Sequence, residues 1–506
     1  MTEQMNHNYK NFSVEFTEKS LLEIIQTKGL IQADHNYLED ARSDKVVTYG
    51  QLASTTDKWS SLLKSKKIAP RSSVLLDISD PVCFGVIHLS LIANGMQSVP
   101  VDPDSPWCEI ERLAGLVDDG VQLIISDRRE CDVFSDIPII DTDELGRPGG
   151  DYKSIKESVI HQSHNSTLGS IIVFTSGSTG KPKGVELTEK QLLYVAREIS
   201  KHNKLQTSDR GFNSLPLFHV NAEVVGLLST LVAGATLVLD RRFHRTNFWE
   251  LLEERRITWM NSVPAILALL SRGVDELHLP KTLRFIRSAS APLPDVVRDF
   301  FSDIELVVSY GMTESASQIT ATPLGQPRRP GSVGLPIGNE LEIRDSKELL
   351  LPTNEVGDVW IRGPGIIKSY LFERANERFD AEGWLNTGDI GKVDKDGYVY
   401  LMGRSDDVIN RGGEKLYPAE IEDVLLEDNR VLEAIVAARE DDILGQVPVA
   451  YIIPVDDDSD AYSQLILYQA LVKKCDKSLT RFKRPVEIIV TRDLPRAATG
   501  KIQRVP

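Results

Sequence analysis

The strongest chemical signal in the chain is a loop rich in glycine, hydroxyl and lysine residues, Thr175-Ser-Gly-Ser-Thr-Gly-Lys-Pro-Lys-Gly184. It follows the run SIIVFT (170–175), whose apolar and β-branched residues predict a buried strand. Glycines let backbone N–H groups approach a ligand, and the hydroxyls and lysines add donors and positive charge, so the loop suits a polyphosphate. The alternative is a flexible linker, but linkers rarely follow a buried strand or carry two lysines.

The loop is not a Walker A loop. That pattern would require glycine where Thr175 stands and Ser or Thr where Pro182 stands. Typical P-loop NTPase chemistry is therefore disfavoured, and a different nucleotide-binding fold is expected.

Four more short motifs follow the loop: YGMTE (310–314), NTGD (386–389), GRSDD (403–407) and LPRAATGKIQR (494–504). The five in this order resemble the adenylate-forming superfamily of acyl-CoA synthetases, luciferases and adenylation domains, over nearly the whole chain. The pattern is most similar to acyl-CoA synthetases of the oxalyl-CoA synthetase-like type. The resemblance implies an acid–thiol ligase that turns a carboxylate and ATP into an acyl-adenylate and pyrophosphate, with Mg²⁺. The acyl group is then transferred to the thiol of CoA, which releases AMP.

The resemblance also implies roles for individual residues. Tyr310 would stack on adenine, Thr313 would donate to the α-phosphate, and Asp389 and Arg404 would bind the ribose hydroxyls. Glu314, with Thr175, would hold Mg²⁺, since a hard dication that bridges phosphates prefers a carboxylate. The full set implied for ATP and AMP is Thr175, Ser176, Gly177, Ser178, Thr179, Gly180, Lys183, Ser290, Ala291, Pro292, Ser309, Tyr310, Gly311, Met312, Asp389 and Arg404.

Residues near the C-terminus match the parts of the family that move. Lys501 matches the adenylation lysine, which reaches between the carboxylate and the α-phosphate. With Thr313, Glu314 and His219 it makes up the implied catalytic set. Asp406 matches the hinge about which a small domain rotates between the two half-reactions. Gly412 and Gly413 match the tunnel through which the pantetheine arm of CoA arrives.

Three segments match the family's acyl pocket: PLFHVNAE (216–223), RSASAPL (287–293) and SYGMT (309–313). We assign His219, Ser288, Ala289 and Gly311 to the pocket. His219 stands where amino-acid-activating relatives carry an aspartate, which disfavours an α-amino acid as substrate. Ala289 replaces a glycine of many medium-chain and aryl ligases and should shorten the pocket. A small or polar acid is therefore expected, unless these residues only touch adenine and backbone.

The elements that must position these residues alternate in type. Between Ser73 and Asp127 the order strand, helix, strand, helix, strand predicts parallel βαβ units. Thr188 with Gln191, and Asn247 with Glu250, predict helix caps. The Pro- and Gly-rich stretch from Thr322 to Gly338 predicts a turn-rich connection without a regular element.

The pattern of predicted helices and strands changes near Arg404. Pro418 is placed to start a helix, and EAIVAARE and VPVAYIIPV read as strands of a small unit. We therefore expect an α/β fold with a large, multi-subdomain N-terminal domain (1–405), whose mixed and parallel sheets are flanked by helices. A small, mobile α+β C-terminal domain (406–506) would carry the adenylation lysine.

Composition narrows the class of protein. The 506 residues have a formal net charge of −16, which disfavours a general nucleic-acid binder. Hydrophobic residues make up 41%, as in a globular protein, and no apolar run approaches the length of a membrane span. Without a signal peptide or a cysteine framework, a cytoplasmic location with reduced thiols is expected.

Several alternatives remain open. A stand-alone adenylation enzyme that loads a carrier-protein phosphopantetheine has the same motifs, because the same thiol arm serves both acceptors. A non-catalytic acyl-adenylate- or nucleotide-binding protein is disfavoured by the intact motif residues. The basic stretch 471–485 suits either the 3′-phosphate of CoA, an acidic carrier protein, or simply a solvated helix face. Glu186 places a negative charge close to the expected phosphates.

Overall fold

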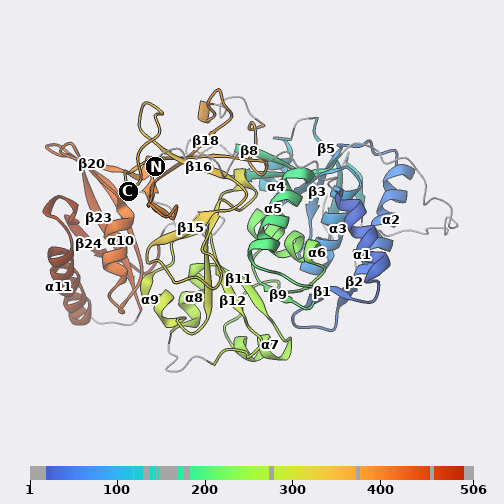
Figure 1. The fold of residues 1–506 in the computed structure, drawn as a ribbon, viewed down its shortest axis with the longest axis horizontal. Coiled ribbons are helices and arrows are strands. Elements are labelled where there is room, and N and C mark those ends of the chain that lie inside the picture. Colours follow the sequence, from blue (N-terminus) through green and yellow to red (C-terminus); the bar gives the residue numbers. More distant parts are fainter. Residues whose placement is uncertain are drawn as a thin grey trace.

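The computed structural model describes residues 19–117, 119–128, 137–140, 142–143, 146–147, 168–175, 183–272, 278–371, 377–455 and 461–494. Three β-sheets with helices packed around them make up the described chain. The expected α/β class, with a large N-terminal part and a small C-terminal part, is confirmed (Figure 1).

The first sheet is built from the parallel units expected after Ser73. Its strands in spatial order are β6 (Ile139–Ile140), β5 (Val121–Ser126), β3 (Ser73–Asp77), β4 (Gln97–Pro100), β7 (Ser170–Thr175) and β8 (Lys183–Thr188). The strands run parallel from β6 to β7, and the edge strand β8 is antiparallel. Because β7 and β8 pair Thr175 with Lys183, the phosphate loop is the turn between them.

The second sheet has a parallel half and an antiparallel half. The parallel strands, with the antiparallel edge β2, are β2 (Val46–Thr48), β1 (Asn36–Asp40), β10 (Thr236–Leu239), β9 (Arg210–Asn213), β11 (Trp259–Ser262), β12 (Phe285–Ser288) and β13 (Glu305–Tyr310). The antiparallel strands continue as β14 (Thr320–Ala321), β15 (Ser332–Pro336), β19 (Val399–Arg404), β18 (Leu385–Val393), β17 (Gly357–Arg362) and β16 (Glu340–Arg344). The change of direction falls between β13 and β14.

Helices cover these two sheets. They are α1 (Leu21–Ile31), α2 (Tyr49–Ser65), α3 (Pro81–Ala93), α4 (Trp107–Ala114), α5 (Glu189–His202), the π-helix η2 (Asn221–Leu228), α6 (Ser229–Ala233), α7 (Phe248–Glu254), α8 (Pro264–Leu270) and α9 (Asp295–Phe300). Helix α3 is buried along almost its whole length because it lies between elements on both sides.

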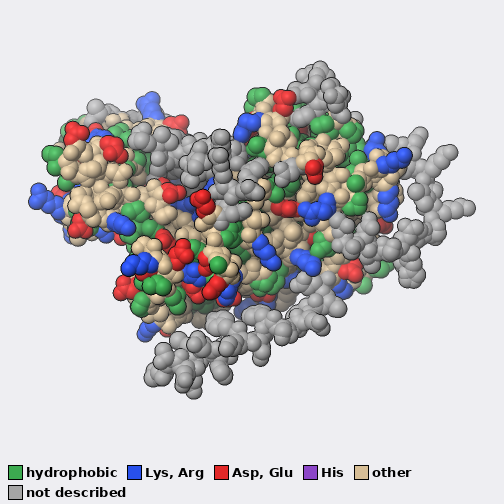
Figure 2. Space-filling model, turned by 90° about the horizontal axis from the view of Figure 1, so that it is seen from above, with side chains coloured by type: hydrophobic (Ala, Val, Ile, Leu, Met, Phe, Trp, Pro, Cys, Tyr) green, Lys and Arg blue, Asp and Glu red, His purple; other side chains and the backbone are tan. Residues whose placement is uncertain are grey.

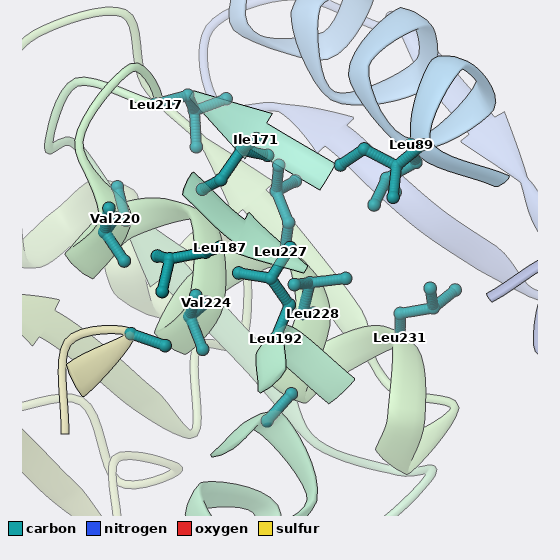
Figure 3. Close-up of a cluster of buried hydrophobic side chains, with 14 of the residues drawn as sticks. Leu89, Ile171, Leu187, Leu192, Leu217, Val220, Val224, Leu227, Leu228 and Leu231 are labelled. Atoms are coloured by element: carbon teal, nitrogen blue, oxygen red, sulfur yellow. The ribbon is translucent and has the colours of Figure 1, made fainter. Parts of the chain in front are cut away.

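The main core joins η2 to the strands that flank the phosphate loop. Figure 3 shows Val220, Val224 and Leu227 turned toward Ile171 of β7 and Leu187 of β8. All of these side chains are buried. The helix that begins in the expected acyl-pocket segment is thus fixed against the sheet that carries the phosphate loop.

The C-terminal elements share a core of their own. They are β20 (Ile409–Arg411), β21 (Glu414–Leu416), α10 (Pro418–Leu426), β22 (Val431–Asp441), β23 (Gly445–Pro454), α11 (Ala461–Ser478), the short 3-10 helix η6 (Arg481–Lys483) and β24 (Glu487–Val490). Their buried apolar residues form one cluster, from Ile409 to Ile488. This part lies at one end of the molecule in Figure 1. The domain boundary at 405/406 itself stays a prediction.

One predicted helix cap is confirmed and the other is wrong. Thr188 and Gln191 form a capping box at the start of α5. At α7, Asn247 has φ +54° and its side chain makes no cap bond. Asn tolerates this left-handed conformation, which gives up the extended backbone geometry that a capping residue normally has.

The prediction of no regular element between Thr322 and Gly338 is also wrong, because β15 lies within it. The strand pairs with both β14 and β19. Gly334 makes this pairing possible: its φ is +92°, and an added Cβ would lie 2.0 Å from the carbonyl carbon of Ala321. Here glycine marks a close approach between backbones rather than a loop.

The surface charges and the length and apolarity of the helices are relevant to nucleic-acid and membrane partners. Acidic and basic side chains are interspersed on the face seen in Figure 2, and no basic band gathers on the described part of it. No helix in the described ranges is long and apolar enough to cross a bilayer.

Candidate active site

The nucleotide motifs meet at the carboxyl end of β13, where the parallel half of the large sheet passes into the antiparallel half. Ligands of open α/β sheets bind outside the carboxyl ends of the strands. Tyr310 ends β13, Asp389 lies on β18, and Arg404 ends β19. Strand pairing sets Asp389 directly opposite Arg404.

Tyr310, Asp389 and Arg404 form a hydrogen-bonded group. The hydroxyl of Tyr310 donates to Oδ2 of Asp389, and Nη1 of Arg404 lies 3.0 Å from Oδ1. Burial raises the pKa of Tyr310 far above its ordinary value, and the charge of Asp389 raises it further, so the phenol stays protonated. A carboxylate fixed in this way is well placed to accept hydrogen bonds from sugar hydroxyls.

Glu314 is buried beneath the nucleotide motifs, in the short 3-10 helix η3 (Thr313–Ser315). Its Oε1 accepts a hydrogen bond of 2.7 Å from the hydroxyl of Tyr370. Among the described residues no group of three His, Cys, Asp or Glu side chains is placed to hold a metal ion. A magnesium ion at Glu314 would therefore take its other ligands from phosphate oxygens, water and the predicted Thr175, whose side chain lies outside the described residues, and oxygen ligands of this kind suit Mg²⁺. Thr313, half-buried, begins the same turn.

Only the end of the phosphate loop can be described. Ser176, Gly177, Ser178, Thr179 and Gly180 lie outside the described residues, as does the side chain of Thr175. Nζ of Lys183, at the start of β8, lies 5.6 Å from the ring centre of Tyr370. Burial lowers the pKa of Lys183, and the nearby guanidinium of Arg378 lowers it further.

The three acyl-pocket segments are joined by one buried side chain, Arg287 of β12. Its Nη1 donates to Oδ1 of Asn221 (3.0 Å) and of Asn261 (3.2 Å). Its Nη2 donates to Oγ of Ser309 (2.6 Å) and Oε1 of Gln318 (2.9 Å). Arg287 is 1% exposed, and burial lowers its pKa to about 9, so it is charged at neutral pH.

The other residues of this pocket segment follow Arg287 in the chain. Ser288 is buried, and its hydroxyl has no hydrogen-bond partner in the described structure. Ala289 is buried after it, and Oγ of Ser290 accepts a 3.2 Å hydrogen bond from Nδ2 of Asn221. Ser290 has φ +76° and is exposed, as are the next two residues, Ala291 and Pro292.

His219 and Gly311 are the remaining residues assigned to the acyl pocket. Burial lowers the pKa of His219, which keeps the imidazole neutral at pH 7, and its ring lies 4.5 Å from that of Phe218. At Gly311 an added Cβ would lie 1.9 Å from the carbonyl oxygen of Ser317, so only glycine fits there. Met312, half-buried, follows it and leads into η3.

The C-terminal residues implied by the motifs are partly visible. Asp406 is exposed in η5 (Ser405–Asp407), between the two parts of the chain. Gly412 (φ +60°) and Gly413 (φ +91°) form the turn between β20 and β21, and an added Cβ at Gly413 would meet open space. Lys501 lies outside the described residues.

The negative charge of Glu186 is compensated. Its Oε1 pairs with Nη2 of Arg71 at 2.8 Å and accepts hydrogen bonds from Gln97 and Ser170. Its charge is therefore paired with a guanidinium, while its expected closeness to the phosphates stays a prediction.

Sequence reasoning missed three residues that the structure places at the site: Asn221, Tyr370 and Arg378. Asn221 links Arg287 to Ser290, and Tyr370 holds Glu314. The available signal was Arg287 itself, since a charged residue inside the strand FIRS (285–288) must find partners when the strand is buried. Nothing in the local spacing marks Tyr370 or Arg378.

Comparison with known proteins agrees with this geometry. Residues 31–371 match the model of the AMP-binding enzyme family, and residues 420–501 match the AMP-binding enzyme C-terminal domain. The chain belongs to the AMP-binding enzyme family.

The relatives are CoA ligases. The chain is 37% identical over 365 residues to oxalate–CoA ligase of Arabidopsis thaliana, covering 70% of each chain, and 37% identical over 350 residues to sulfoacetate–CoA ligase of Cupriavidus necator, covering 66% of each. The structure of o-succinylbenzoate CoA synthetase from Bacillus subtilis with an acyl-adenylate superposes with a TM-score of 0.83 at 27% identity, covering 97% of this chain and 98% of that one. Another structure of that enzyme contains ATP and a magnesium ion.

The chain is thus an acyl-CoA synthetase, an AMP-forming acid–thiol ligase that uses ATP with magnesium and takes CoA as co-substrate.

Proposed function

We propose that this acyl-CoA synthetase activates a small acid that carries a second anionic group. The observation that supports this most strongly is the charge of Arg287. All four of its hydrogen-bond partners are neutral oxygens, and among the described residues no carboxylate pairs with it. An uncompensated buried charge is costly unless an opposite charge comes close.

Asn221 connects the guanidinium of Arg287 to the pocket, because its amide hydrogen-bonds to Arg287 on one side and to Ser290 on the other. Its Oδ1 faces Arg287, so its Nδ2 group is turned toward Ser290, where it donates to Oγ. A substrate anion near Ser290 would accept from the same amide and feel the field of the guanidinium behind it. Arg287 itself would act as a positioning residue, because its Nη groups are already bonded.

Two further features favour a small acid. Ala289 is buried at the position where added bulk would shorten the pocket, and the imidazole of His219, which the resemblance assigns to the pocket, is polar but uncharged. The acids named for two relatives, oxalate and sulfoacetate, each carry a second acidic group besides the carboxylate.

In the first half-reaction, the acid's carboxylate would attack the α-phosphorus of ATP and pyrophosphate would leave. Tyr310, Asp389 and Arg404 would hold the adenosine, Thr313 would donate to the α-phosphate, and Lys501 would reach between the two reacting anions. Bound at Glu314, Mg²⁺ would neutralise charge on the leaving pyrophosphate.

The second half-reaction would use the other face of the C-terminal domain. With Asp406 as hinge, the domain would rotate and bring Gly412 and Gly413 to the site, where the CoA thiol displaces AMP. The proposal also includes the domain division at 405/406 and the residue roles given above. It further includes a cytoplasmic location, where ATP and CoA are both available.

The proposal is tested by measuring pyrophosphate release with ATP and Mg²⁺ over a panel of acids, once with CoA and once without it. The panel runs from oxalate, malonate and sulfoacetate through aryl acids to fatty acids. A CoA thioester formed from a small dianionic acid is expected. Turnover of fatty or aryl monoacids alone would contradict the substrate class, and acyl-adenylate without transfer to CoA would point to a carrier-protein acceptor.

A further inference from the structure

Arg378 lies against the nucleotide motifs, although no motif contains it. A Cβ added at Gly388, inside the NTGD motif, would lie 2.6 Å from Nη2 of Arg378 and 3.1 Å from Nη2 of Arg404. Two guanidinium groups therefore converge on one glycine, next to the Asp389 that is expected to hold the ribose. Gly388 has φ +74°, a left-handed conformation that a larger side chain would adopt only with strain.

Among the described residues, no carboxylate forms an ion pair with Arg378. Its Nη1 makes a long hydrogen bond of 3.4 Å to the hydroxyl of Tyr370, and its Nη2 is buried with no hydrogen-bond partner in the part of the chain that the structure describes. Three carboxylates lie near this region: Glu314 accepts from Tyr370, Asp389 pairs with Arg404, and Asp406, which also acts on Lys183 and Arg404, is exposed to solvent. A buried, unpaired guanidinium nitrogen is costly unless a ligand supplies the acceptor.

A third cation faces the same space. Arg378 lowers the pKa of Lys183, which places its positive charge beside the lysine that ends the phosphate loop. Arg404 acts on Lys183 in the same direction. Three cations gathered in a partly buried region repel one another, and an anion with several charges would relieve that repulsion.

We propose that Arg378 binds the β- and γ-phosphates of ATP and the departing pyrophosphate, and that it steadies Glu314 through Tyr370. Nη2 is the group that contacts the phosphate oxygens. Nη1 donates to Tyr370, whose hydroxyl donates to Oε1 of Glu314. This inference rests on the proposed function, because it assigns a phosphate contact within the same site.

The test compares the binding of ATP, AMP and pyrophosphate to the full-length protein by calorimetry, with Mg²⁺ and without acid. Arg378→Ala should weaken ATP and pyrophosphate about 10–100-fold, as expected when a charged hydrogen bond is lost, and AMP by less than about threefold. Arg378→Lys should recover part of the loss. Arg362→Ala is the matched control, because Arg362 is a surface arginine of β17 paired with Glu340.

The outcomes separate this inference from the proposed function. Equal weakening of ATP and AMP would place Arg378 at the ribose or the α-phosphate and overturn it, as would unchanged binding of all three. Thermal unfolding identifies a variant that fails to fold, and Arg378→Lys then carries the test. A wild-type protein that binds ATP but turns over no acid would remove the proposed function while leaving the ATP-to-AMP comparison valid.

Discussion

The ribose subsite and the acid end of the active site manage charge in opposite ways. At the ribose subsite, Asp389 and Arg404 neutralise each other and Tyr310 supports the pair. At the acid end, the charge of Arg287 is surrounded by amide and hydroxyl oxygens alone. The first arrangement suits the neutral ribose of a nucleotide. The second arrangement leaves the positive charge of Arg287 available to attract a ligand that carries a negative charge.

The same contrast separates two groups of residues. Those that bind the nucleotide serve every member of a family, and those at the acid end select the substrate. The nucleotide residues lie in short contiguous motifs, and strand pairing alone sets Asp389 opposite Arg404. The acid end is assembled from η2, β12 and β13, which are far apart in the sequence. If the comparison is right, variants at the nucleotide end should slow all acids alike, and variants at the acid end should change which acid is preferred.

The largest effect is expected from Lys501→Ala. Loss of a cation that stabilises charge in the transition state should slow acyl-adenylate formation about 100–1000-fold for every acid tested. Thioester formation from a supplied acyl-adenylate should be nearly unchanged, which separates the two half-reactions. An equal loss in both half-reactions would mean that the lysine supports the fold or the domain arrangement rather than adenylation.

Asn221→Asp should reverse the preference at the acid end. The new carboxylate would lie where Oδ1 of Asn221 now accepts from Arg287, 3.0 Å away, and would neutralise the guanidinium without changing side-chain size. We expect kcat/KM for a dianionic acid to fall about 10–100-fold, while that for its monoanionic amide analogue changes little.

The exposed turn residue Asn354 provides the control, because Asn354→Asp adds the same charge far from the pocket. Arg287→Gln should change the preference in the same direction, with a loss of stability visible in the unfolding temperature. An Asn221→Asp enzyme that keeps its preference for the dianion would show that Arg287 has no part in substrate selection.

Gly413→Leu should affect only the second half-reaction, by about tenfold. The side chain would project from the β20–β21 turn into the open space where the CoA arm is expected, and φ +91° adds local strain. Gly383→Leu is a matched control, because Gly383 also has a positive φ (+81°) and open space around it. If adenylation and transfer slow together, the turn is structural and the tunnel assignment is wrong.

The smallest expected effect is a shift in pH dependence. Burial and the charges of Arg378 and Arg404 lower the pKa of Lys183, against the opposing carboxylates of Glu314 and Asp406. Lys183 therefore loses its proton at a lower pH than an ordinary lysine, and ATP affinity should weaken severalfold as the pH rises, starting below the pH at which an ordinary lysine loses its proton. Removing Arg378 should move this loss to higher pH. AMP affinity, measured in parallel, should stay level if Lys183 contacts only the outer phosphates.

The sequence predicted the fold well where periodicity is local. The alternation from Ser73 to Asp127 and the capping box of Thr188 are both present, because they depend on neighbouring residues. Predictions failed where a distant backbone decides, as at β15, whose Gly334 lies against Ala321. The left-handed conformation of Asn247 is a similar case.

The residues of the candidate site show the same difference between local and distant determinants. Motif residues such as Tyr310, Asp389 and Arg404 could be named from sequence, and the structure brings them together. Asn221, Tyr370 and Arg378 could not, because their importance lies in contacts with residues far away in the chain. Sequence spacing carries no record of such contacts.

The most direct test of the account is the ratio of kcat/KM between a dianionic acid and its neutral-ended amide analogue in the wild-type enzyme. Suitable pairs are oxalate with oxamate, malonate with malonamate, and succinate with succinamate, each assayed by CoA-dependent pyrophosphate release. The account predicts that the dianion is preferred by about tenfold or more in the pair that fits the pocket. Equal rates for both members of every pair, or a preference for the amide, would contradict it.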